Sequence, residues 1–172
     1  SMLSQGSKWS DHCTIARWAQ THLPNERAVF IVHRLDRAAT GLILIAHSKK
    51  AARALSAMFE KHDLEKTYQI IIHGDHRSRP QPETLTSEVN GKSACSHFSH
   101  LDYSQEHNAS LVQVNIETGR KHQIRIHAAS IAMPVWGDRL HGYTNDSHDE
   151  KSIDLQLCAV SLRFVCPLSA EQ

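Results

Sequence analysis

The stretch VHRLDRAATG, residues 32–41, places Asp36 between two arginines, just before the uncharged run TGLILIA. The β-branched and apolar residues on either side predict two strands, over residues 28–33 and 41–47. Asp36 therefore lies in a loop that joins two strands, a position where functional side chains are often found. From these residues alone, its carboxylate is either a salt-bridged surface charge or a group kept ionised for chemistry.

Working outward from this loop, apolar residues three and four positions apart predict a helix over residues 48–63, with Ser48 as its N-cap. A shorter helix over residues 11–23 is capped by Asp11. Residues 75–92 are rich in Pro, Ser, Arg and Gly and predict a loop or a loose hairpin. The remaining segments predict strands over residues 66–74, 95–104, 110–119 and 155–167 and a helix over residues 120–132. This balance of many strands and few helices predicts an α+β fold in one domain.

The composition excludes several classes of protein. Of the 172 residues, 40% are hydrophobic, which is enough to bury a substantial core. No apolar run approaches the length of a membrane span. The chain has 14 histidines and four cysteines, but none follows a familiar metal-binding spacing. We therefore expect no metal site and no disulfide framework, and we expect reduced thiols in a cytoplasmic protein.

A second segment, ETGRKHQIRIH over residues 117–127, concentrates positive charge in a chain whose net charge is only +1. Between residues 119 and 139 the single acid is Asp138. The basic residues there are Arg120, Lys121, Arg125 and Arg139. A local basic patch of this kind suits contact with a phosphate backbone.

The motifs HRLDRAATGLILIA, EKTY and TGRKHQIRIHAASIAMPVWGD, in this order and spacing, resemble those of the RluA-type RNA pseudouridine synthases. The resemblance covers about residues 29–167. It implies a mixed, largely antiparallel sheet with flanking helices and a central cleft. It also implies isomerisation of specific uridines in ribosomal or transfer RNA, without metal or cofactor. Residues 29–172 would form the catalytic domain, and residues 1–28 an atypical or truncated N-terminal segment.

The resemblance assigns roles residue by residue. Asp36 matches the catalytic aspartate, and Arg125 matches the arginine that pairs with it. Tyr68 matches the tyrosine that lies against the target base and takes part in proton movement at C5. Leu157 matches a hydrophobic residue beside the base. The expected RNA-binding residues are Arg34, Arg37, Arg120, Lys121, His122 and Leu157. An ionised Asp36 either attacks C1′ of the ribose or assists departure of the base, and the sequence leaves both open.

Two further interpretations stay open at this point. Ala39, where the family usually has a hydroxyl residue, and the short N-terminal segment are compatible with an RNA-binding, chaperone-like relic that lacks turnover. A histidine-rich metal hydrolase is the least favoured. Under the preferred interpretation the partner is ribosomal or transfer RNA, no membrane is involved, and the protein is a monomer.

Overall fold

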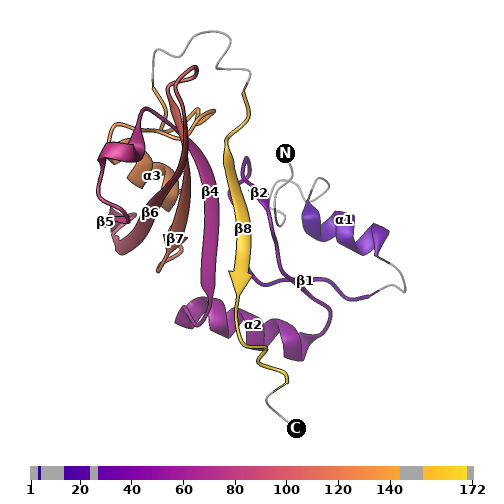
Figure 1. Cartoon of the computed structure of the whole chain (residues 1–172). Coiled ribbons are helices and arrows are strands. Elements are labelled where there is room, and N and C mark those ends of the chain that lie inside the picture. The colour runs from indigo at the N-terminus through magenta and orange to yellow at the C-terminus, as the bar shows by residue number, and fades with distance from the viewer. Residues whose placement is uncertain (1–3, 5–13, 24–26, 144–152, 170–172) are drawn as a thin grey trace. The chain divides into compact units, whose positions relative to one another are not determined.

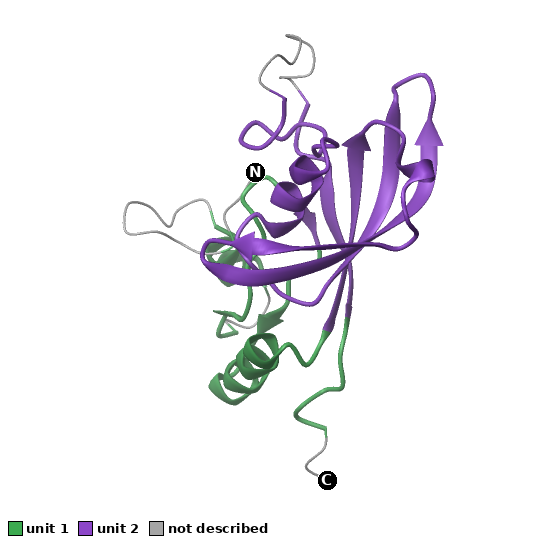
Figure 2. Cartoon of the chain, turned by 90° about the vertical axis from the view of Figure 1, so that its left-hand side faces the viewer, with its two compact units in different colours: residues 1–38, 42–64, 163–172 green, residues 39–41, 65–162 purple. Residues whose placement is uncertain are grey.

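A computed structural model describes residues 4, 14–23, 27–143 and 153–169. The chain forms two compact units (Figure 2). Unit 1 contains Ser1–Ala38, Leu42–Leu64 and Arg163–Gln172, and unit 2 contains Ala39–Gly41 and Glu65–Leu162. The expected domain boundary between residues 28 and 29 stays a prediction.

Unit 2 is built on a six-stranded sheet in the order β2-β8-β4-β7-β6-β5 (Figure 1). Neighbouring strands β4 and β7, β7 and β6, and β6 and β5 are antiparallel, whereas β2 runs parallel to β8. The predicted α+β fold with a mixed, largely antiparallel sheet is therefore confirmed. The strands are β2 (Thr40–Gly41), β4 (Glu65–His73), β5 (Glu83–Val89), β6 (Lys92–Ser104), β7 (Ala109–Ile116) and β8 (Leu157–Arg163).

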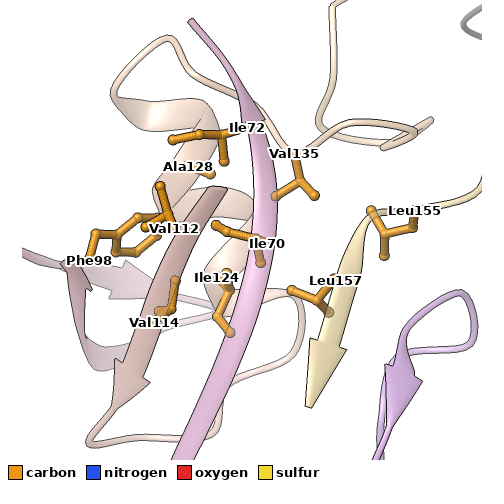
Figure 3. Close-up of a cluster of buried hydrophobic side chains, with 10 residues drawn as sticks. All are labelled: Ile70, Ile72, Phe98, Val112, Val114, Ile124, Ala128, Val135, Leu155 and Leu157. Carbon is orange, nitrogen blue, oxygen red and sulfur yellow. The ribbon is translucent and has the colours of Figure 1, made fainter. Parts of the chain in front are cut away.

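The core of unit 2 lies between this sheet and helix α3 (Gln123–Ser130). Alternate residues of β4 and β7 point toward the core, so Ile70 and Val112 are buried in one cluster with Ile124 and Ala128 of the helix. Figure 3 shows how these side chains meet. The buried cluster comprises Ile70, Ile72, Phe98, Val112, Val114, Ile124, Ala128, Val135, Leu155 and Leu157.

Unit 1 contains helices α1 (Ile15–His22) and α2 (Lys49–Lys61) and the short antiparallel pair β1 (Phe30–Ile31) and β3 (Ile45–Ala46). The predicted cap of α2 is confirmed, because the Ser48 hydroxyl accepts a hydrogen bond from the backbone N–H of Ala51 at 3.1 Å. Among the described residues, none of the helices is both long and apolar enough to cross a membrane.

Three details differ from the sequence prediction. The strands expected over residues 28–33 and 41–47 shrink to two-residue pairings. Residues 75–92, expected to be a loop or a loose hairpin, contain the 3₁₀ turn η2 (His76–Ser78) and the whole of β5, which forms a regular antiparallel hairpin with β6. Thr14 caps α1, whereas the expected cap, Asp11, lies outside the described residues.

Candidate active site

The basic segment at residues 117–127 is held in shape by the side chain of Gln123, which is 3% exposed. Its amide oxygen accepts hydrogen bonds from the Thr118 hydroxyl at 2.7 Å and the Arg120 backbone N–H at 3.0 Å. Its amide nitrogen donates to the Cys95 carbonyl and the Ser96 hydroxyl, both at 2.9 Å. One buried side chain thus fixes the loop to strand β6, a role that the sequence analysis missed.

Arg125 projects from the first turn of α3 and is 6% exposed. Its Nε donates to Oδ2 of Asp138 at 2.7 Å, and its Nη2 donates to Oδ1 at 2.6 Å. This is a bidentate, charge-assisted pair, which fixes the plane of the guanidinium as well as its position. The expected pairing of Arg125 with Asp36 stays a prediction.

Asp138 holds this arginine from a tight turn. Its Oδ1 also accepts hydrogen bonds from the backbone N–H groups of Leu140 and His141, each at 3.0 Å. Burial alone would raise the pKa of Asp138, but the hydrogen bonds from Arg125 and from the two backbone N–H groups lower it below its ordinary value. The carboxylate therefore stays ionised. Its signal in the sequence was that it is the single acid in a basic segment.

Tyr68 and Leu157 belong to the same side of unit 2. Tyr68 lies in the middle of β4, partly exposed, and packs against the buried cluster that contains Leu157. Leu157 begins β8 and is 5% exposed. Its carbonyl accepts a hydrogen bond from the Thr40 hydroxyl at 3.4 Å, which joins the end of the first motif to β8.

The pairing of β2 with β8 requires glycine at position 41. At Gly41 φ is +103°, and a Cβ there would collide with the backbone of Ala159.

The loop that carries Asp36 is anchored within unit 1 by His33 and Leu35, which precede the aspartate. Nε2 of His33 accepts a hydrogen bond from the Leu44 backbone N–H at 2.8 Å, and the His33 ring stacks on Phe59 with centroids 4.4 Å apart. The Leu35 backbone N–H donates to the Ser4 hydroxyl at 3.1 Å. Asp36 is partly buried. The two arginines expected to contact RNA, Arg34 and Arg37, are exposed.

Positive charge gathers around the basic loop. Lys121 is exposed, and Nδ1 of His122 lies 3.0 Å from Nε2 of His141. Lys66, which the sequence analysis did not single out, is 7% exposed, and burial and the nearby positive charge of Arg120 lower the pKa of its ammonium. The close approach of these two cations favours a site for an anion.

The family model of RNA pseudouridylate synthases matches residues 1–130 of the chain. The chain belongs to this family. The resemblance of its motifs to the RluA-type synthases is thereby confirmed. The chain is 32% identical over 160 residues to the ribosomal large subunit pseudouridine synthase D of Zymomonas mobilis, and the match covers 83% of this chain and 50% of that protein. It is 35% identical to the tRNA pseudouridine synthase C of Yersinia pestis, covering 66% of this chain and 53% of that protein.

The fold of the synthase family is also present in solved structures. Human RNA pseudouridylate synthase domain containing 1 superposes with a TM-score of 0.77 at 20% identity, covering 89% of this chain and 69% of that one. Human RNA pseudouridylate synthase domain containing 4 superposes with a TM-score of 0.72. The chain spans about half the length of the curated relatives it matches.

The expected site residues are divided between the two units. Tyr68, Arg125 and Leu157 belong to unit 2, together with the basic loop, and Asp36 belongs to unit 1. Their roles, and the central cleft that would unite them, stay predictions.

Proposed function

We propose that the chain isomerises specific uridines in RNA to pseudouridine. In this reaction the C1′–N1 bond of the nucleotide breaks, the base turns and a C1′–C5 bond forms. The proton on C5 is released to solvent and N1 takes up a proton, so the product is an isomer of uridine. The reaction balances without an oxidant or a cofactor. Membership of the family, together with the intact Asp36, Tyr68 and Arg125 at motif positions, is the observation that carries the proposal.

Each residue has a role that its chemistry suits. Asp36 supplies a carboxylate that attacks C1′ or assists departure of the base. Tyr68 offers an aromatic ring for stacking against the base and a hydroxyl for proton transfer at C5. Arg125, held by Asp138, supports the Asp36 carboxylate as its counter-charge. Leu157 offers a hydrophobic side chain that contacts the base.

Reaching the base requires flipping it out of the RNA, which costs a few kcal/mol. Stacking on an aromatic ring returns about 1–3 kcal/mol. Phosphate contacts supply the rest, and Arg34, Arg37, Arg120, Lys121 and His122 are our candidates. We propose ribosomal or transfer RNA as the substrate, because relatives named for each are similar to the chain. We place the reaction in the cytoplasm and expect a monomer, which light scattering would test.

The decisive experiment is tritium release from RNA that carries 5-tritiated uridine, with ribosomal and transfer RNA as separate substrates. Asp36→Asn keeps the size of the side chain and removes its charge, so we expect release at background with RNA binding retained. Asp63→Asn, an exposed position in unit 1, is the matched control and should react normally. Substantial turnover by Asp36→Asn would show that Asp36 is not the catalytic residue. Tight RNA binding without release by the unaltered protein would indicate a binding protein instead of an enzyme.

A further inference from the structure

Three side chains that the proposed reaction does not use, Cys95, His97 and Glu117, meet on the face of the sheet in unit 2 that points away from α3. Ala94, Ser96 and Phe98 of β6 are fully buried toward α3. Since successive side chains of a strand point to opposite faces, Cys95 and His97 lie on the other face.

Glu117 completes the group from the neighbouring strand. Ile116, the last residue of β7, pairs with Ser96. The backbone N–H of Glu117 then donates to the Cys95 carbonyl at 3.2 Å. The register of β6 against β7 therefore brings Glu117 across from Cys95, although the two are far apart in the sequence.

The ligating atoms of the three side chains all lie within 4.8 Å of one another. Sγ of Cys95 is 3.7 Å from Nε2 of His97, and Nε2 of His97 is 2.7 Å from Oε1 of Glu117. In a tetrahedral zinc site, Zn–S of about 2.3 Å and Zn–N of about 2.0 Å separate sulfur and nitrogen by about 3.5 Å. The sulfur–nitrogen distance already fits. The oxygen must move outward slightly, and the Glu117 side chain is 63% exposed, so it is not confined by packing.

We propose that Cys95, His97 and Glu117 form a Zn²⁺ site. Thiolate, imidazole and carboxylate are the three ligand types that zinc accepts, and three protein ligands leave a fourth position for water. Mg²⁺ and Ca²⁺ prefer oxygen ligands alone, so this donor set disfavours them. A bound thiolate and carboxylate together balance the two charges of the ion.

Groups around the site hold two of its ligands in place. The Thr84 hydroxyl lies 3.0 Å from Nδ1 of His97, so it can accept the Nδ1–H proton and leave the Nε2 lone pair directed at the metal. The Thr86 hydroxyl lies 3.8 Å from Sγ of Cys95. The backbone N–H of Cys95 donates to the Thr118 hydroxyl at 3.1 Å, which fixes the main chain at the ligand.

The position of the site gives the ion a structural consequence. Glu117 is the first residue of the basic segment at residues 117–127, and Cys95 belongs to β6. A bound ion would tie this segment to the sheet on the outer face, while Gln123 ties it on the inner face. The inference does not depend on the proposed reaction.

The test is a titration of the reduced chain with Zn²⁺ in competition with a chromophoric chelator. We expect the unaltered protein to bind one equivalent of Zn²⁺. Cys95→Ser and His97→Gln should each weaken the affinity for Zn²⁺ at least about a hundredfold. Cys158→Ser and Cys166→Ser are the matched controls and should retain the site. Thr84→Val keeps all three ligands and should weaken binding by about 10–100-fold, the usual effect of removing a group that orients a metal ligand. Mg²⁺ should not compete.

Co²⁺ provides a second readout that does not depend on activity. The Co²⁺-loaded protein should show a thiolate-to-metal charge-transfer band that Cys95→Ser abolishes, with ligand-field bands of four-coordinate intensity. The proposal is overturned if Cys95→Ser binds Zn²⁺ as the unaltered protein does, if Cys158→Ser or Cys166→Ser removes the site, or if the chain binds no zinc. In the last case, His97 and Glu117 are simply a hydrogen-bonded pair.

Discussion

Replacing Asp138 by asparagine tests whether this residue holds Arg125 in place. The substitution keeps the shape of the side chain and removes its charge. If the amide oxygen takes the place of Oδ1, it still accepts from Leu140, His141 and one nitrogen of Arg125. The amide nitrogen then takes the place of Oδ2 and faces Nε of Arg125, so two donors oppose each other where a 2.7 Å hydrogen bond was.

The cost follows from these contacts. A hydrogen bond to a charged group contributes about 1.5–3 kcal/mol, and breaking a buried ion pair outright costs about 3–5 kcal/mol. Asp138→Asn loses one charge-assisted bond and weakens a second, at a position where the two side chains are 7% and 0% exposed. We therefore expect the free energy of unfolding to fall by about 3 kcal/mol.

The assay is urea unfolding at neutral pH and at lower pH, with Asp102→Asn as the control. Asp102 is exposed on β6, so its substitution should stay within about 0.5 kcal/mol of the unaltered protein. The folded-state pKa of Asp138 is lowered, so its contribution is present above the ordinary pKa of 3.8 and is lost as pH falls through the lower folded value. The difference between Asp138→Asn and the unaltered protein should therefore narrow below pH 3.8.

The same variant should slow single-turnover catalysis, because misplacing a reacting group by about 1 Å costs on the order of a hundredfold in rate. A loss of less than about 1 kcal/mol for Asp138→Asn at neutral pH would contradict the role assigned to Asp138, since an intact pair would be worth more than that. A difference in the free energy of unfolding between the two proteins that does not change with pH would contradict it equally.

Further predictions concern the basic residues. Changing Arg120 and Lys121 to Ala should flatten the slope of log K against log salt by about one to two units, and an unchanged slope would place the RNA path elsewhere. Lys66→Met should flatten that slope by about one unit. It should leave the free energy of unfolding equal or higher, because burial and Arg120 disfavour the charge of Lys66 in the folded state. A large loss of stability in urea unfolding would contradict this. Arg125→Lys should lower the single-turnover rate strongly with little change in RNA affinity, since an ammonium cannot form the two-bond pair; a normal rate would show that charge alone suffices.

Helix α2 and strands β4, β7 and β8 could be predicted because their apolar residues repeat with a clear period. Strand β5 could not, because its sequence, ETLTSEV, is mostly polar. Its first residue, Glu83, is buried only because Arg79 and His76 bind its carboxylate, and neither partner is visible in a periodic pattern. The run over residues 41–47 was predicted to be one strand. Gly41, with its positive φ, instead ends the two-residue pairing of β2 with β8, and β3 then pairs within unit 1.

The candidate site also contains two kinds of residue. Some could be identified from the sequence motifs, and others have roles that only their contacts in the structure show. Asp36, Tyr68 and Arg125 stand in motifs that identify them without a structure. Asp138 and Gln123 also lie within the third motif, residues 118–138, but the resemblance gave them no role, because their contacts depend on a turn and on strand β6 that only folding brings near. The Cys95–His97–Glu117 group makes the strictest demand, because it depends on the register of β6 against β7. A slip of one residue would turn every side chain of one strand to the opposite face. Glu117 would then face the core, so the zinc titration also tests this register.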